Sequence, residues 1–236
     1  MNEYLKVFPI SEIFTSPQGE GMYCGTAMTF VRLAGCSVGK PFPKERYEQG
    51  LPIFTEMCTL YDGRTFECDT DYRRKDKLTL PQIFAKVPAG VSHLCITGGE
   101  PFIHDLNLFV TWAEDHDMQL HVETSGTIPM KKAFPPEGKK GEDVWVTVSP
   151  KFNVLDEMIN RADEIKLLVD DKFDIKAIPQ TVLKHNRVYL QPVNYTHEIN
   201  ADNLRLVMDL HKKFPNWRVS LQLHKVLSAY LNERIL

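Results

Sequence analysis

Three of the chain's five cysteines fall in one polar loop punctuated by proline and glycine, and thiols grouped in this way could hold a metal centre. Cys36, Cys58 and Cys68 are separated by 21 and 9 residues, a spacing that matches no compact zinc or haem motif. A structural zinc site would need a fourth thiolate or imidazole. Cys24 and Cys95 are the candidates, but Cys95 lies in an apolar run, where a cysteine behaves as a small hydrophobe. Three thiolates without a fourth would suit an iron–sulfur cube with one open iron. The residues alone leave three interpretations: this cluster, a zinc site, or thiols that merely share a loop.

A second motif, "TGGEP" at residues 97–101, follows an apolar run and could meet a ligand. Two glycines at a strand end leave the backbone uncovered, because no Cβ stands in the way. Glu100 could then pair with an ammonium group of that ligand. Such a turn is a weak signal alone, since most Gly-Gly turns are only tight turns. Its place after a cysteine-bearing loop strengthens it.

The elements that must position these motifs alternate between apolar strands and amphipathic helices. Strands are predicted at 26–35, 91–97, 118–124, 144–148, 164–169, 187–193 and 217–224. Helices are predicted at 79–87, 104–116, 153–162 with Asn153 as its cap, 172–184 more weakly, and 200–214. The alternation indicates parallel βα units, and polar motifs follow the strand ends, where α/β barrels carry their chemistry. We expect a single domain over residues 1–236, folded as an incomplete or distorted (β/α) barrel.

Composition narrows the function classes. The net charge of −3 gives no pull toward nucleic acid or anionic membranes, and 43% apolar with 25% charged residues is ordinary for a globular protein. The start of the chain lacks the apolar core of a signal peptide, and no run approaches the roughly 18 apolar residues of a membrane span. We therefore expect a cytoplasmic protein with reduced thiols and no nucleic-acid or membrane partner.

A series of short blocks, in order from residue 10 to residue 225, resembles a known family. The blocks are "ISEIFTSPQGEG", "FVRLAGC", "CDT", "CITGGEPFIHDL", "VETSGT", "WVTVSPK", "RADEIK", "LQP" and "LQLHK". A cysteine loop after one strand and GGEP after the next resembles the radical S-adenosylmethionine superfamily. The ordered set resembles the 7-carboxy-7-deazaguanine synthase family within it, and implies a partial barrel of the radical S-adenosylmethionine type.

The cysteine loop departs from the family's pattern. The family usually places its three cluster cysteines within about eight residues, as CxxxCxxC. Here Cys36 and Cys68 match the first and last positions by context, and Cys58 is the only cysteine between them. We therefore expect an enlarged cluster-binding loop at about residues 37–67, folded as a lid or extra helix over the cluster.

The resemblance implies a radical lyase that converts 6-carboxy-5,6,7,8-tetrahydropterin to 7-carboxy-7-deazaguanine, with ring contraction and loss of ammonia. It implies a 4Fe–4S cluster, S-adenosylmethionine and Mg²⁺ as cofactors. It also implies a place in queuosine- or archaeosine-type biosynthesis, a homodimer, and an electron donor such as a flavodoxin. Hydrogen abstraction from an unactivated carbon exceeds what side-chain bases can do, so the protein's part is binding and orientation.

The resemblance also assigns residues to each ligand. The cluster ligands would be Cys36, Cys58 and Cys68. The contacts to S-adenosylmethionine would be Gly99, Glu100, Ser149, Pro150, Lys151 and Gln191. The substrate contacts would be Pro17, Gln18, Gly19, Glu20, Arg32, Thr97, Glu123 and His224, with Arg32 suited to a carboxylate. Thr70 resembles the position that ligates Mg²⁺, a hard cation that prefers oxygen ligands.

Two other functions fit part of the pattern. An activase that makes a glycyl radical on a protein partner would share the cluster and GGEP, but it would not need the substrate contacts. A non-catalytic zinc-binding module would use the same cysteines and bind neither S-adenosylmethionine nor a pterin. Taken singly, Ser149 also fits a turn cap, Lys151 a solvated charge, and His224 a structural histidine.

Overall fold

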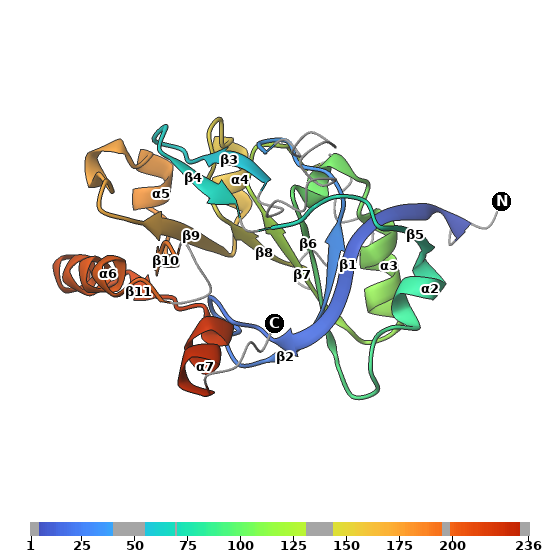
Figure 1. Ribbon diagram of the computed structural model, residues 1–236. Helices are drawn as coiled ribbons and strands as arrows, with labels where there is room; N and C mark the ends of the chain where they lie inside the picture. The colour runs from blue at the N-terminus through green and yellow to red at the C-terminus, as the bar shows by residue number, and fades with distance from the viewer. Residues whose placement is uncertain (1–4, 40–54, 69, 131–143, 195–198, 232–236) are drawn as a thin grey trace, which may run out of the picture.

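The chain folds around one curved sheet (Figure 1). The computed structural model describes residues 5–39, 55–68, 70–130, 144–194 and 199–231, and the side chains of residues 55–57 and 67 are left aside. From one edge to the other, the nine strands are β11 (Arg218–Val219), β10 (Val188–Pro192), β9 (Glu164–Val169), β8 (Val144–Val148), β7 (Gln119–Thr124), β6 (His93–Gly98), β2 (Ala27–Leu33), β1 (Val7–Pro17) and β5 (Asp76–Thr79).

The sheet is mostly parallel and open. All neighbours from β2 to β11 pair in parallel, whereas β1 pairs antiparallel with both β2 and β5. Because β5 and β11 form two free edges, the sheet does not close into a barrel. The incomplete (β/α) barrel expected from the alternation is confirmed.

Helices cover one face of the sheet and leave the other concave. They are α2 (Leu80–Phe84), α3 (Asn107–Asp115), α4 (Asp156–Arg161), α5 (Gln180–Leu183) and α6 (Ala201–Lys213), with 3₁₀ turns η2 (Pro101–Ile103) and η4 (Ile175–Ala177). The last helix, α7 (Leu223–Leu231), lies instead beside the concave face, which its first residues help to line. In β6, Leu94 and Ile96 join the core that contains Phe109 of α3. Their neighbour Thr97 points to the other face, because strand side chains alternate. The alternation places the apolar core between the sheet and the helices, and polar side chains on the concave face.

Two cysteines lie on a small separate sheet. Strands β3 (Thr55–Thr59) and β4 (Thr65–Cys68) form an antiparallel hairpin within the enlarged loop, and Figure 1 shows it near the ends of β8 and β9. The expected lid or extra helix is a hairpin over this part of the loop, and residues 40–54 lie outside the described residues.

Three predicted elements differ from the structure. The strand predicted at 217–224 ends after Val219, and Leu223 instead begins α7, whose apolar residues also have helical spacing. Asn153 does not cap α4, because it has a φ of 64° in a left-handed turn and the helix begins at Asp156. The helix predicted at 172–184 is divided into η4 and α5. Within the described ranges, no helix is long and apolar enough to cross a membrane.

Candidate active site

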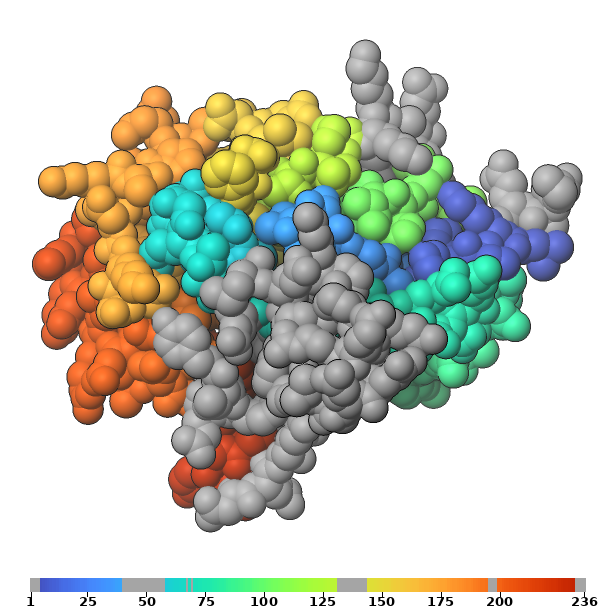
Figure 2. Space-filling model, turned by 45° about the horizontal axis from the view of Figure 1, so that its top comes forward, coloured from blue at the N-terminus to red at the C-terminus, as the bar shows by residue number. Residues whose placement is uncertain are grey.

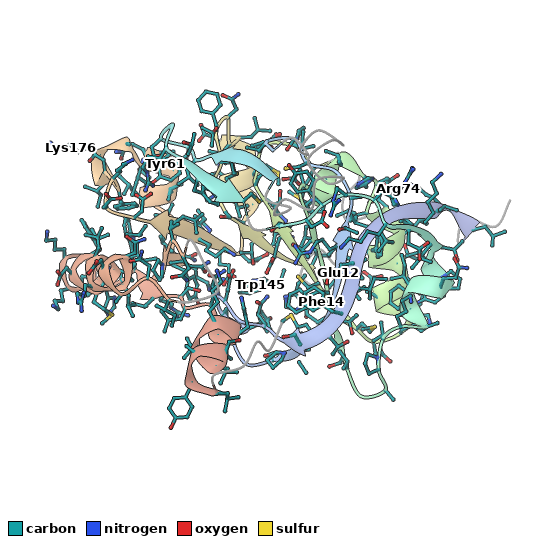
Figure 3. All side chains as sticks on the ribbon, viewed as in Figure 1. Glu12, Phe14, Tyr61, Arg74, Trp145 and Lys176 are labelled. Carbon is teal, nitrogen blue, oxygen red and sulfur yellow. The ribbon has the colours of Figure 1, made fainter. Side chains whose placement is uncertain are left out.

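One cavity of about 620 Å³ occupies the concave face of the sheet and brings most of the predicted residues together. Figure 3 shows Glu12 and Phe14 on the inner side of β1, where they line this cavity. The predicted site residues that line it are Pro17, Gln18, Gly19, Glu20, Arg32, Cys36, Cys58, Cys68, Thr70, Thr97, Gly99, Glu123, Ser149, Lys151, Gln191 and His224. Glu100 and Pro150 do not line it.

The three loop cysteines line the cavity from two different sheets. Cys36 follows β2 of the large sheet, whereas Cys58 and Cys68 lie on the hairpin. The Cys36 sulfur accepts backbone N–H groups of Val38 and Gly39 at 3.4 and 3.3 Å. None of the five cysteines forms a disulfide. Cys24 is exposed and Cys95 is buried, and neither lines the cavity.

Burial favours the protonated form of two of the three loop thiols. Burial raises the pKa of Cys58 to about 11, against the opposing charge of Lys151, and burial also raises the pKa of Cys36. Such thiols are protonated at neutral pH, and a bound metal centre would convert them to thiolates. Among the described residues, no three His, Cys, Asp or Glu side chains converge on a site for a single metal ion. Three sulfurs on one wall fit the donor set of a cluster with one open iron.

The glycines of GGEP have a packing role that differs from our sequence interpretation. A Cβ on Gly99 would lie 2.3 Å from the Gly35 carbonyl oxygen and 2.5 Å from the Cys36 Cβ. A Cβ on Gly98, which has a φ of 155°, would lie 2.4 Å from the Leu33 carbonyl oxygen. The missing side chains therefore let the end of β6 pack against the backbone that carries Cys36. Gly99 still lines the cavity with its backbone.

Glu100 is fully buried and its carboxylate is committed to neighbouring backbone and hydroxyl groups. It accepts the Thr124 hydroxyl at 2.8 and 2.9 Å, the Ser125 N–H at 2.9 Å, the Ser125 hydroxyl, and the Phe102 N–H at 3.0 Å. These bonds join the turn after β6 to the turn after β7. Glu100 therefore holds the two turns in place, and its contact with an ammonium group stays a prediction.

The SPK segment after β8 connects the cavity to the hairpin. Lys151 Nζ donates to the Ser149 hydroxyl at 2.9 Å and to the Ser149 carbonyl at 3.1 Å. Burial lowers the pKa of Lys151, while the nearby thiols oppose this shift. Leu60 of the hairpin forms a β-bridge with Lys151, and the Phe152 N–H donates to the Thr59 carbonyl at 3.0 Å. Lys151 therefore lies beside the cysteines rather than in solvent.

A hydrogen-bonded network of amides and carboxylates forms a second wall of the cavity. Gln18 Nε2 donates to Glu123 at 3.1 Å, and the Thr97 hydroxyl donates to the same carboxylate at 3.3 Å. Glu20 accepts amide N–H groups of Gln191 at 3.0 Å and Gln222 at 3.1 Å. This wall presents carboxylate oxygens to the cavity, a surface suited to a ligand edge rich in N–H donors.

Lys166 is a site residue that the sequence analysis missed. It lies in β9, lines the cavity and forms a buried ion pair with Glu20. Burial, the largest single influence, pushes the pKa of Glu20 upward, but Lys166 together with the amides of Gln222 and Gln191 holds the pKa below its usual value. In turn, the neighbouring carboxylates raise the pKa of Lys166 despite its burial. The available signal was one charge within the otherwise apolar end of "EIKLLV".

Arg32, His224 and Thr70 complete the cavity from different elements. Arg32 Nε lies 3.5 Å from Glu12, and its guanidinium lies 5.8 Å from the centre of the Phe14 ring. His224 lies at the start of α7, where a Cβ on Gly19 would come within 3.1 Å of its Nδ1. Thr70 lines the cavity near the cysteines.

Sequence and structure comparisons agree on the relatives of the chain. No protein-family model matches it. The 7-carboxy-7-deazaguanine synthase of Buchnera aphidicola is 32% identical over 234 residues, which cover 93% of this chain and 98% of the relative. That of Escherichia coli K12 is 30% identical over 238 residues, covering 94% and 98%. A crystal structure of QueE from Escherichia coli superposes with a TM-score of 0.65 at 28% identity, covering 92% of this chain and 95% of that one.

The partial barrel, its cysteine-lined cavity and these relatives define an enzyme of the radical S-adenosylmethionine class, a lyase whose chemistry depends on an iron–sulfur cluster and S-adenosylmethionine. The chain belongs to the 7-carboxy-7-deazaguanine synthase family.

Proposed function

We propose that this enzyme converts 6-carboxy-5,6,7,8-tetrahydropterin to 7-carboxy-7-deazaguanine, with loss of ammonia, on a route to queuosine- or archaeosine-type nucleosides. The observation that carries the proposal is that one cavity is lined by two sets of side chains. The first wall consists of the three cysteines, and the second holds the carboxylates of Glu20 and Glu123. A glycyl-radical activase would use the first wall but would have no need of the second.

For the cofactors, Cys36, Cys58 and Cys68 would hold a 4Fe–4S cluster, and the chemistry supplied when it is bound is reductive cleavage of S-adenosylmethionine to a 5′-deoxyadenosyl radical. The residues that would hold S-adenosylmethionine are Gly99, Ser149, Pro150, Lys151 and Gln191, with Glu100 acting through the turns it joins. Lys151, whose amine bonds to Ser149, would offset the negative charge of the thiolates. This donor set fits the group because all three thiols line one cavity.

For the substrate, the chain's residues would bind both ends of the ring system. Glu123, oriented by Gln18 and Thr97, would accept N–H groups of the aminopyrimidinone edge. Arg32 would pair with the carboxylate, because a guanidinium forms two parallel hydrogen bonds with that group. Pro17, Gly19 and Glu20 would border the ring, with His224 packed beside Gly19. The Thr70 hydroxyl would ligate Mg²⁺ near the substrate carboxylate.

We also propose one domain over residues 1–236, a homodimer, and a one-electron donor of the flavodoxin type. These features are expected of the family and are supported here by the likeness over nearly the whole chain.

The test is anaerobic reconstitution with iron and sulfide, followed by reductant, S-adenosylmethionine, Mg²⁺ and carboxytetrahydropterin. Mass spectrometry should find a product lighter by one ammonia, and Cys58→Ala should abolish it. Cleavage of S-adenosylmethionine without ring contraction would refute the substrate and leave the activase. A colourless protein that binds zinc through the three cysteines would refute the radical chemistry.

A further inference from the structure

We propose that Arg64 is a positioning residue whose ion pair with Asp170 fixes the β3–β4 hairpin on the end of β9, and so sets where Cys58 and Cys68 lie relative to Cys36. The inference rests on the proposed cluster ligands but concerns residues outside them. It addresses how an enlarged loop can hold two sulfurs in a defined place.

Arg64 lies in the turn between β3 and β4 and reaches across to the large sheet. Its guanidinium donates to Asp62 at 2.6 Å, pairs with Asp170, and donates to the Leu168 carbonyl at 3.2 Å. The same group lies 5.5 Å from the centre of the Phe173 ring. Three of these four partners belong to β9 or to the segment after it, so one side chain joins the two sheets.

The ion pair is buried, so removing one of its partners costs more than removing a partner of a surface pair. The Arg64 and Asp170 side chains are only 10% and 6% exposed. The partner carboxylates raise the pKa of Arg64 although burial opposes this, so the guanidinium stays charged. Loss of Arg64 would leave two buried carboxylates, Asp170 and Asp62, without their shared cation, a much larger penalty than loss of an exposed pair.

The hairpin transmits the position of Arg64 to the cysteines. Thr59 and Thr65 are paired across the hairpin beside the turn, and Cys58 is paired with Phe66 one step further. The bridge from Leu60 to Lys151 holds the adjacent edge against the SPK segment. Figure 2 shows the hairpin packed against the segments that follow β8 and β9. Release of Arg64 would leave the hairpin attached along one side, and Cys58 would lose its fixed burial.

The first test uses metal-free protein and alkylation of each thiol, followed by mass spectrometry. Cys58 is 6% exposed and Cys95 is 0% exposed in the core, so Cys95 reports global unfolding in the same sample. In Arg64→Gln, Cys58 should react roughly tenfold faster or more, while Cys95 stays protected. Unchanged labelling of Cys58, or parallel acceleration of both thiols, would overturn the proposal.

Two further variants define the pair. Arg205→Gln removes an exposed ion pair with Asp202 on α6 and should leave Cys58 labelling unchanged. The double variant Arg64→Gln/Asp170→Asn removes the two charges of this pair and leaves Asp62 in place, and its effect should be smaller than the product of the two single effects. Independent, multiplicative effects would refute coupling between the two residues.

The second test measures iron. After anaerobic reconstitution, Arg64→Gln should lose iron to a chelator roughly tenfold faster than wild type, with less iron bound per chain. Equal rates would refute the positioning role. A wild type that holds no cluster would refute the proposed ligands instead, because the thiol experiment reads the hairpin without metal.

Discussion

Lys166 and Glu20 form a buried ion pair on the carboxylate wall, although they are 146 residues apart in the chain. The negative charges of Glu123 and Glu164 also attract Lys166, so one ammonium group interacts with three carboxylates. The pair therefore controls the charge of the surface that faces the proposed substrate.

Replacing Lys166 with methionine should destabilise the fold by about 3–5 kcal/mol at pH 8, since it leaves Glu20 buried without its cation. The pKa of Glu20 would then rise above its unfolded value, so the carboxyl would take up a proton as the pH falls. The gap in unfolding free energy between wild type and variant should therefore narrow from pH 8 to pH 5. Denaturant unfolding across this range measures it. Lys212→Met, which removes an exposed pair with Asp209, is the control, and a pH-independent gap would contradict the argument.

Glu100→Gln should destabilise the protein by about 1–3 kcal/mol, because the new amide places a donor where every partner of Glu100 is itself a donor. Each kcal/mol should lower the melting temperature by roughly 2–4 °C in a domain of this size. Thermal unfolding of the metal-free protein would show it. Glu157→Gln, at an exposed position in α4, should have little effect, and equal shifts in the two variants would exclude a special role for Glu100.

Gly99→Ala should cost about 1–3 kcal/mol, because its Cβ would collide with the Gly35 carbonyl and with Cys36. Displacement of that backbone should also speed alkylation of Cys36 in the metal-free protein. Gly90→Ala is the matched control, since it has a φ of 85° but open space around it. In Gly90→Ala the new side chain strains the backbone but collides with no other atom. Faster Cys36 labelling in both variants would mean that general destabilisation, not this contact, is responsible.

His121 should make the protein sensitive to acid. Burial lowers its pKa to about 3, and His93, whose Nδ1 lies 2.9 Å from His121 Nε2, adds to this. Since the folded value lies below the unfolded value of about 6.5, the unfolded chain binds the extra proton, and stability falls as the pH drops through this window. The expected loss from this group between pH 8 and pH 5 is about 2 kcal/mol.

In His121→Phe, the free energy of unfolding should fall less between pH 8 and pH 5 than in the wild type. Urea unfolding at each pH would measure the change. His116→Gln, at an exposed position, should keep the wild-type slope. An unchanged slope in His121→Phe would show that other groups cause the acid sensitivity.

The sequence predicts strands and helices well where the local spacing of apolar residues favours only one of the two. The apolar run from Leu94 to Ile96 locates β6, although it does not distinguish the two faces of the strand, because Cys95 between them is buried on the other face. The "LQLHK" segment fits a strand and a helix equally well on local grounds. A long-range bond from the Leu223 N–H to the Gly19 carbonyl, at 3.0 Å, accompanies the helix there. Local spacing contains no information about such a partner.

The same limit explains which site residues were found. Most were located by resemblance, and the cavity collects them from the ends of parallel strands, from the antiparallel strand β1, from the hairpin and from α7. Lys166 was missed because its place in the site depends on an ion pair with Glu20, which is 146 residues away in the chain. The packing role of Gly99 depends on Gly35 and Cys36, which a sequence does not place beside it.

The contacts of the β3–β4 hairpin also allow the connection between β2 and the hairpin to vary in length. Its place is set by contacts at Lys151 and Asp170 rather than by the number of residues that connect it to β2. Doubling a flexible connection costs only about 0.6 kcal/mol in closure entropy. Residues can therefore be inserted before Thr55 without moving the sulfurs. In this chain, three cysteines that are widely spaced in the sequence line one cavity, and a search for a compact cysteine interval would not find them.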